Sequence, residues 1–125
     1  MTHSSLNEID TDYLHRIMDN IPVAVTVADL EGTITYFNDY AQQILDRKPE
    51  YIGTDIRLYH KESGSIDKIE RLIGDFKNRK RSWSSYEANR YGKNILVLFT
   101  PLEKDGHVIG IIQSVIVMDD TKTNE

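Results

Sequence analysis

The sequence contains no cysteine. This absence excludes disulfides, thiolate metal sites, iron–sulfur clusters and cysteine nucleophiles. Without cysteines, the sequence also does not indicate whether the protein works in an oxidising or a reducing compartment. Long apolar runs are also missing, because none approaches the roughly 18 residues that a membrane-spanning helix needs. Residues 1–5 lack the basic and apolar segments of a signal peptide. We therefore expect a single-domain cytoplasmic protein with no membrane contact.

Positive charge is scarce as well. The chain has 15 Lys and Arg against 20 Asp and Glu, which gives a formal net charge of -5. This balance argues against a nucleic-acid partner, because such proteins neutralise phosphates with clustered basic side chains. The one dense basic run, residues 77–81, is interpreted as the solvated end of a helix, where positive side chains complement the helix dipole.

The first half of the chain predicts a helix, a hairpin and a second helix. Apolar residues recur at helical spacing over residues 6–20. Two β-branched segments, 23–28 and 33–37, flank a turn that ends in Gly32 and predict two paired strands. Asn38 is the expected N-cap of the next helix. One face of that helix carries Tyr40, Ala41, Ile44 and Leu45.

The second half predicts one more helix and three strands. The helix covers about residues 65–77, with Ser63 or Ser65 as its cap. The strands follow at residues 82–90, 93–102 and 107–118. This order predicts an α+β fold whose antiparallel sheet has helices on one face. Since most strands are apolar on both sides, we expect the N-terminal helix to cover the other face, alone or with a second copy of the chain.

This order of elements, with several local motifs, resembles the PAS (Per-Arnt-Sim) sensory domain. The segment NIPVAVTVADLEGTITYFNDYAQQILDRKPEYIGTDI, at 20–56, is similar to the hairpin and asparagine-capped helix of that family. The segment GKNILVLFTPLEKDGHVIGIIQSVIVMDDT, at 92–121, is similar to its last two strands and its Asp-x-Thr-like close. The resemblance covers about residues 13–121, with a flanking segment at 1–12 and a polar tail at 122–125.

The resemblance implies a five-stranded sheet in the order 2-1-5-4-3 with a pocket between the sheet and the helices. PAS domains hold heme, flavin, organic acids or lipids there, or leave it empty, so the cofactor stays open. They signal through dimer contacts and flanking helices to a kinase, cyclase or transcription domain. The sequence ends soon after the Asp-x-Thr-like close, so we expect an excised domain or a stand-alone protein that acts on a separate partner.

His60 lies in the stretch LYHKESGS, just before the helix that would face the sheet. It could finish a loop at the edge of the pocket, contact a bound ligand or, least favoured, coordinate heme iron. In heme-binding PAS sensors the iron histidine lies on the helix itself, and residues 65–77 contain no histidine. No two histidines have a metal-binding spacing, so we expect no other metal site.

The last strand offers a polar candidate. If this strand is regular, Ile109, Ile111, Gln113, Val115 and Val117 share one face, and Gln113 points into the pocket or bonds across the sheet. Resemblance to the LOV light sensors places their flavin-facing glutamine at Val117.

Trp83 could stack on a flat cofactor or form a dimer contact, and core packing is the favoured interpretation. Tyr86 and Glu87 lie on opposite faces of their strand, and a one-residue slip in register exchanges them.

Apolar side chains form the rest of the expected lining. The residues expected to face the sheet from the helices and loops are Phe37, Ile44, Ile52, Leu58, Ile69, Leu72 and Ile73, with Val97 and Phe99 on the fourth strand. The candidate ligand-binding residues are Phe37, Leu58, His60, Ile69, Leu72, Ile73, Trp83, Val97, Phe99 and Gln113.

Two functions remain open from the sequence. One is a sensory module that binds a small molecule and changes its dimer or partner contacts. The alternative is a ligand-free interaction module that dimerises through the N-terminal helix and the outer sheet face. We expect no enzyme, because no nucleophile elbow, phosphate-binding loop or His-Glu-x-x-His motif is present.

Overall fold

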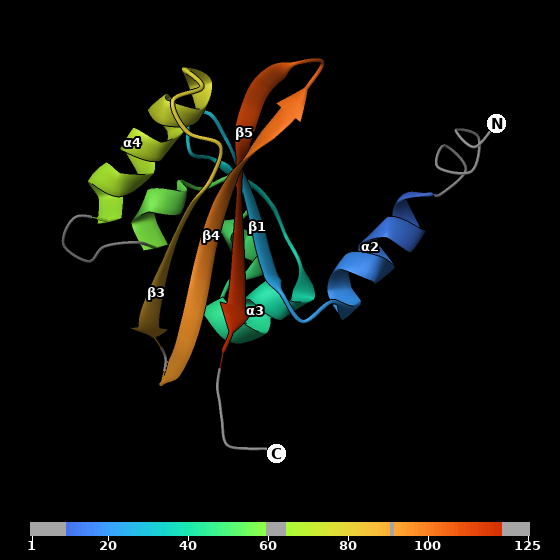
Figure 1. Cartoon of the computed structure of the whole chain (residues 1–125). Coiled ribbons are helices and arrows are strands. Elements are labelled where there is room, and N and C mark those ends of the chain that lie inside the picture. Colours follow the sequence, from blue (N-terminus) through green and yellow to red (C-terminus); the bar gives the residue numbers. More distant parts are fainter. Residues whose placement is uncertain (1–9, 60–64, 91, 119–125) are drawn as a thin grey trace.

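The computed structural model describes residues 10–59, 65–90 and 92–118 (Figure 1). Its elements are α2 (Thr11–Asn20), β1 (Ala24–Asp29), β2 (Ile34–Phe37), α3 (Asp39–Leu45), the 3-10 helices η1 (Pro49–Tyr51) and η2 (Ile56–Tyr59), α4 (Ser65–Lys77), β3 (Ser84–Arg90), β4 (Lys93–Lys104) and β5 (His107–Val117). In this part of the chain, no helix is long and apolar enough to cross a membrane.

The five strands form one antiparallel sheet in the order β2-β1-β5-β4-β3, which confirms the expected α+β architecture. Helices α3 and α4 lie on one face of this sheet (Figure 1). The largest fully buried apolar side chains fill the space between them. They are Phe76, Phe99, Ile34, Ile56, Ile69, Ile111 and Val115.

Asn38 caps α3 as the sequence predicts. Its side-chain Oδ1 accepts hydrogen bonds from the backbone N–H of Ala41 at 3.1 Å and of Val25 at 3.0 Å. Its Nδ2 donates to the carbonyls of Met18 and Val23 at 2.7 and 2.9 Å. One buried side chain therefore joins the end of α2, the start of β1 and the first turn of α3.

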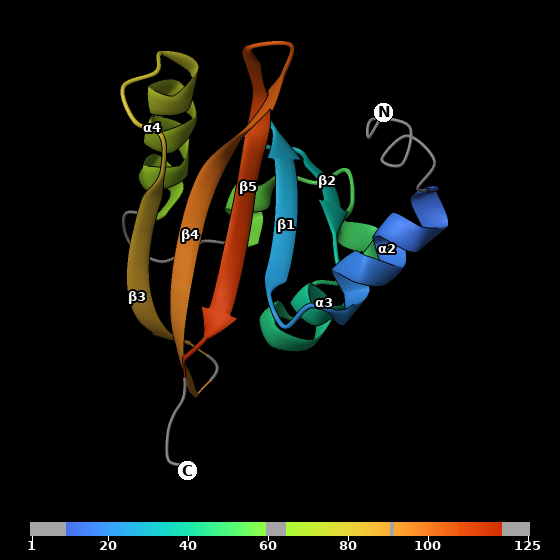
Figure 2. The same ribbon diagram turned by 45° about the vertical axis from the view of Figure 1, so that its right-hand side comes forward.

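Helix α2 lies beyond the β2 edge of the sheet rather than over its outer face (Figure 2). It packs on α3, and its His15 ring stacks on Tyr36 of β2 with 5.8 Å between ring centroids. The expectation that this helix covers the outer face is therefore wrong. The reason is the Asn38 network, which anchors the C-terminal end of α2 at α3 and holds the helix at the edge.

A bulge interrupts the regular alternation of β5. Leu102 of β4 pairs with Gly110 and Glu103 pairs with Val108, so Ile109 is skipped and is exposed. The expectation that Ile109 shares the inner face with Gln113 is wrong, because one extra residue reverses the direction of the side chain. From Ile111 to Val117 the odd-numbered residues face the helices, as expected.

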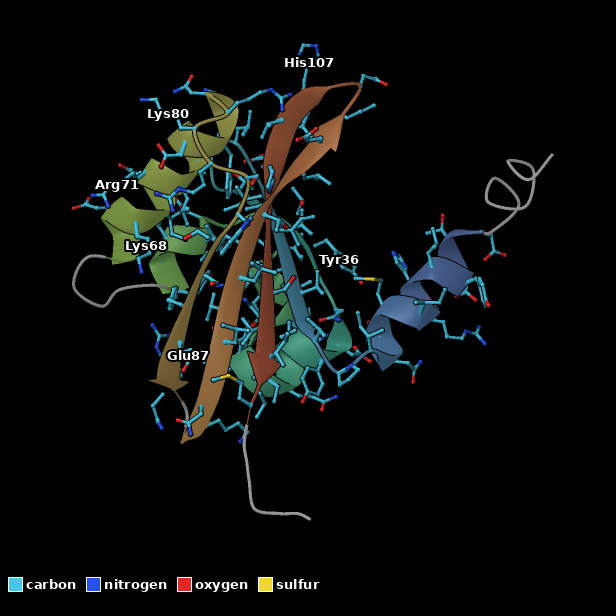
Figure 3. The ribbon with its side chains drawn as sticks, viewed as in Figure 1. Tyr36, Lys68, Arg71, Lys80, Glu87 and His107 are labelled. Carbon is cyan, nitrogen blue, oxygen red and sulfur yellow. The ribbon has the colours of Figure 1, made fainter. Side chains whose placement is uncertain are left out.

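The register of β3 decides between Tyr86 and Glu87. Tyr86 pairs with the buried Val97 and packs against the core, whereas Glu87 pairs with Leu96 and is exposed (Figure 3). Tyr86 is therefore the side chain of β3 that points toward the helices.

Candidate functional site

A cavity of about 190 Å³ lies on the inner face of the sheet, between strands β3, β4 and β5 and the segment that follows α3. It contains Arg47, and we call it the Arg47 cavity. The lining residues are Leu45, Asp46, Arg47, Tyr51, Tyr59, Tyr86, Ala88, Arg90, Ile95, Val97, Gln113 and Val115. The wall therefore combines apolar strand residues with three tyrosines, one amide and three charged side chains.

Arg47 is the buried polar centre of this wall and is only 5% exposed. Its Nε donates to the Thr26 hydroxyl at 3.3 Å, and its Nη2 donates to Oε1 of Gln113 at 3.1 Å. Gln113 is 2% exposed and Thr26 is fully buried. Because buried polar groups need partners, these two bonds fix the direction of the guanidinium against the sheet.

The end of α3 turns Arg47 toward the sheet. Asp46 adopts the left-handed conformation, with φ of 56°, and its N–H donates to the carbonyl of Ala41. The N–H of Arg47 donates to the same carbonyl at 3.5 Å. A left-handed residue at this place ends the helix and redirects the chain, so the next side chain points under the sheet instead of along the helix surface.

Two stacked tyrosines form part of the cavity wall beside Arg47. The rings of Tyr51 from η1 and Tyr59 from η2 lie 4.3 Å apart between centroids. The Tyr59 hydroxyl is hydrogen-bonded to Thr54 at 2.9 Å. The guanidinium carbon of Arg47 lies 5.7 Å from the centre of the Tyr59 ring, within the range of a cation–π contact. The aromatic rings therefore flank the charged group.

A charged brace holds η2 in place beside the cavity. Both Nε and the backbone N–H of Arg57 donate to Oδ1 of Asp55 at 2.9 Å, and Arg57 also pairs with Glu70 of α4 at 3.1 Å. The hydrogen bond from the Arg57 side chain lowers the pKa of Asp55 below its usual value. The brace fixes the segment that carries Tyr59.

The size of the cavity limits what it can hold. Pockets for drug-sized ligands measure roughly 300–1,000 Å³, and heme and flavin are at least of that size. At about 190 Å³ the Arg47 cavity is smaller than this range. Among the residues that the structure describes, the cavity included, no cluster of three His, Asp or Glu side chains could hold a metal ion.

Two of the predicted ligand-binding residues, Val97 and Gln113, line the cavity. Five others belong to the packed core and are absent from the cavity wall. They are Phe37, Ile69, Leu72, Ile73 and Phe99. His60 lies outside the described residues. The structure thus brings together only a small part of the predicted set.

Leu58 and Trp83 lie at the surface. The prediction that Leu58 faces the sheet and the favoured core position of Trp83 are therefore wrong, whereas a dimer contact through Trp83 stays a prediction. Trp83 is 59% exposed because β3 is an edge strand that begins at Ser84, two residues later than predicted, so that Trp83 precedes it. Leu58 is 52% exposed. In a 3-10 helix, residues three apart share a side, and in η2 Ile56 and Tyr59 are the pair that points inward. Ile52, also expected to face the sheet, is exposed.

Sequence reasoning missed Arg47 and the tyrosine pair. The buried side-chain amide of Gln113 needs a hydrogen-bond partner, and this partner, Arg47, lies 66 residues earlier in the chain. No spacing rule connects two such positions. The only local signal was a single arginine directly after an amphipathic helix, which is a common surface pattern.

A sequence profile described as "PAS domain" matches residues 14–119. The chain belongs to the PAS domain family. PAS domains are sensory modules, and the resemblance stated from the motifs is confirmed. No curated protein matches the sequence.

Several solved structures share this PAS fold. A C-terminal domain from Streptococcus mutans has a TM-score of 0.72 at 19% identity, with 86% of this chain and 84% of that chain covered. The PAS domain of Bordetella pertussis BvgS has a TM-score of 0.66 at 15% identity, with 87% and 86% covered. A sensory box sensor histidine kinase from Vibrio cholerae has a TM-score of 0.63 at 15% identity, with 97% and 100% covered. At these identities the likeness is one of fold.

Proposed function

We propose that this PAS domain is a non-catalytic sensory module that binds a small molecule in the Arg47 cavity and signals through contacts with a second copy or a partner protein. The observation that carries the proposal is the buried Arg47–Gln113 pair in the wall of a concave, partly apolar cavity. Ligand sites typically combine apolar walls with a few such positioned polar groups.

The position of Gln113 on β5 suggests how binding would be transmitted. Successive residues of a strand point to opposite faces, so Ile112 and Ser114 lie on the outer face while Gln113 lies in the cavity. A ligand that displaces the Arg47–Gln113 contact would shift β5, which lies in the middle of the sheet. A ten-fold difference in ligand affinity between two states changes their balance by about 1.4 kcal/mol.

Native mass spectrometry of the freshly purified protein tests this proposal, together with an absorption spectrum to reveal a coloured cofactor. Ala88 of β3 lines the cavity, so Ala88→Leu should fill part of it. Ser85 of the same strand is exposed, so Ser85→Leu is the matched control. We expect added mass in the wild type and in Ser85→Leu, and its loss in Ala88→Leu.

The proposal fails if the wild type carries no added mass and takes up none from a metabolite extract. It also fails if Ala88→Leu and Ser85→Leu retain the bound species equally, since the ligand would then lie elsewhere. A strong Soret or flavin band would contradict the size limit of the cavity.

We also propose that this domain dimerises through α2 and the outer face of the sheet. The apolar stripe of α2 exposes Tyr13, Leu14 and Ile17, and the outer face of β5 exposes Ile116. A two-fold interface between identical chains covers such surfaces on both copies at once. This surface is the observation that favours the ligand-free interaction module as the second candidate function.

Sedimentation velocity tests the dimer directly. Ile17→Glu and Ile116→Glu each place a charge in the proposed interface and should yield monomers. Ile52 is exposed but lies on neither surface, so Ile52→Glu is the control and should leave the dimer intact. A monomeric wild type, or a dimer that survives both changes in the interface, contradicts the proposal. A dimer without any bound molecule favours the interaction module.

A further inference from the structure

A groove with a basic wall lies beside α4, and none of its described lining residues belongs to the Arg47 cavity. It consists of two open hollows that share Arg81 in their walls. The first hollow, of about 110 Å³, lies between α4 and the start of β3. The second, of about 380 Å³, lies between the end of α4 and β4. We call the two hollows together the α4–β3 groove.

The charged side chains of the α4–β3 groove are mostly positive. Those that line it are Lys68, Arg71, Arg79, Lys80 and Arg81 against Asp75 and Glu103. The whole chain has a formal net charge of -5, so the rest of the molecule is more negative than this total. A local charge opposite in sign to the rest of a protein steers a complementary partner to that place. The groove therefore favours a negatively charged partner.

Two arginines of the groove make ion pairs within the protein. Arg81 pairs with Asp75 of α4 at 3.2 Å, and Arg79 pairs with Glu103 of β4 at 3.6 Å. Arg79 also donates to the carbonyl of Gly106. It does so from the left-handed conformation, with φ of 56°, at a helix end where glycine is the usual residue. Both carboxylates of the groove are thus engaged by arginines.

Three further positive side chains of the groove have no ion-pair partner among the residues that the structure describes. They are Lys68, Arg71 and Lys80, which lie along one side of the molecule (Figure 3). The helix dipole favours cations near the last turn and so explains Lys80. It does not explain Lys68 and Arg71, which lie in the first half of α4. The Lys68 amine lies 4.0 Å from the centre of the Tyr86 ring, which holds it beside β3.

The length of the groove suits a chain better than a single small anion. From Lys68 to Phe76, which line its two hollows, the helix rises about 12 Å. This rise matches roughly four residues of extended chain. Among the described strands β3 pairs only with β4, so its other edge is open. Trp83 lies between Ser82 and Ser84 of the groove wall and adds exposed aromatic surface of the kind that is common at interfaces.

We propose that the α4–β3 groove docks an acidic segment of a partner protein, whose carboxylates pair with Lys68, Arg71 and Lys80. The negative charge of the rest of the chain opposes a nucleic acid, because its phosphates extend beyond a short groove. A short acidic segment avoids this repulsion, since it covers the groove alone. The domain thus has a docking site for a partner that is separate from the Arg47 cavity.

Two synthetic peptides separate the effect of charge from that of shape. In one peptide with blocked ends, four glutamates alternate with glycines, and in the other glutamines replace the glutamates. Trp83 is the single tryptophan of the chain, so its fluorescence reports binding at the groove. We expect the glutamate peptide to bind roughly ten-fold more tightly than the glutamine peptide, because several individually weak exposed ion pairs add up. The difference should shrink as added salt screens the charges.

Two double variants with the same change in net charge test the position of the site. Lys68→Gln with Lys80→Gln removes one positive charge from each hollow. Lys48→Gln with Lys93→Gln is the matched control, because both lysines lie outside the groove. We expect the first pair to weaken binding of the glutamate peptide at least about three-fold and the control pair to leave it nearly unchanged. All four lysines are exposed, so both double variants should fold.

Several results would overturn the inference. Equal binding of the two peptides, or no binding of either, would mean that the charge of the groove holds no acidic segment. Equal losses in the two double variants would mean that net charge governs binding and the groove does not. A single-stranded DNA oligonucleotide that binds more tightly than the glutamate peptide would assign the groove to nucleic acid. A dimer that sediments as a monomer only in the groove variant would assign it to a second copy.

Discussion

Asn38 should stabilise the fold well beyond the contribution of an ordinary helix cap. The side chain is 1% exposed and makes four hydrogen bonds, two as acceptor and two as donor. Asp and Asn are about equally good at an N-cap. If capping α3 were its only role, Asn38→Asp would therefore leave the stability nearly unchanged.

The structure predicts a different result for Asn38→Asp. An aspartate keeps the two acceptor bonds but cannot donate to the carbonyls of Met18 and Val23, which lie 2.7 and 2.9 Å from Nδ2. Each lost partner costs about 1 kcal/mol at the lower end of the range for buried groups. A buried carboxylate facing two carbonyls adds about 1 kcal/mol or more, while the helix N-terminus returns about 0.5 kcal/mol. We expect a net loss of about 2–3 kcal/mol.

Urea unfolding followed by circular dichroism measures this loss as a lower midpoint at unchanged slope. Asn20→Asp is the control, because Asn20 makes an exposed bond to the carbonyl of Arg16, so its loss should cost less than about 0.5 kcal/mol. A value for Asn38→Asp within about 0.5 kcal/mol of the wild type would show that the links to α2 and β1 contribute nothing, and would refute this reasoning.

Three further predictions concern the sheet and its titrating groups. A Cβ added at Gly110 would lie 2.4 Å from the carbonyl oxygen of Ala28, so Gly110→Ala should lower stability by about 1–3 kcal/mol in urea unfolding. The side-chain hydrogen bond from Arg57 lowers the pKa of Asp55, so the brace stabilises the fold above the unfolded pKa near 4 and is lost as pH falls through the lower folded value. Asp55→Asn should therefore reduce the free energy of unfolding at pH 7 and weaken the fall of this free energy at acid pH. The Tyr36 hydroxyl is buried without a hydrogen-bond partner, so Tyr36→Phe should leave stability unchanged or raise it by up to about 1 kcal/mol. Burial raises the pKa of Tyr36, so its contribution is present below about pH 10 and is lost as pH rises through the folded value, and Tyr36→Phe should remove that alkaline loss.

Each of these predictions has a clear contrary result. A neutral Gly110→Ala would mean that β1 and β5 separate easily at this point. If Asp55→Asn and the wild type lose the same stability as the pH falls, the Arg57–Asp55 brace does not contribute to the pH dependence. A large loss of stability in Tyr36→Phe would mean that the hydroxyl is hydrogen-bonded in solution.

Local patterns predicted most of the fold. Alternation and β-branched residues located the five strands, and the cap at Asn38 placed the start of α3 correctly. The position of α2 was not predictable from its own apolar stripe, because the stripe indicates only that one face needs cover. Bonds from distant residues decide where the helix lies. The bulge at Ile109 was also missed, although Gly110 inside the strand is a local sign of a bulge or of a close backbone approach.

The cavity depends even more on long-range placement. Gln113 was found because the alternation of the strand places this polar side chain on the same face as apolar residues, and a buried amide needs partners. Its partner Arg47 was missed, because the chain is redirected by the left-handed conformation of one residue, Asp46, and no local sequence pattern predicts that conformation. Trp83 was misplaced because aromatic residues are usually buried, whereas this one precedes an edge strand.

The most direct test of the central claim is a nitrogen–proton NMR titration of the wild-type protein with the bound molecule that native mass spectrometry identifies. The side-chain amide of Gln113 reports on the cavity, and the backbone amide of Ser85 reports on the outer face of an edge strand. The account predicts a large saturable shift of the Gln113 amide, with little change at Ser85. A Gln113 amide that stays in place at saturating ligand would contradict the claim that the Arg47 cavity is the sensory site.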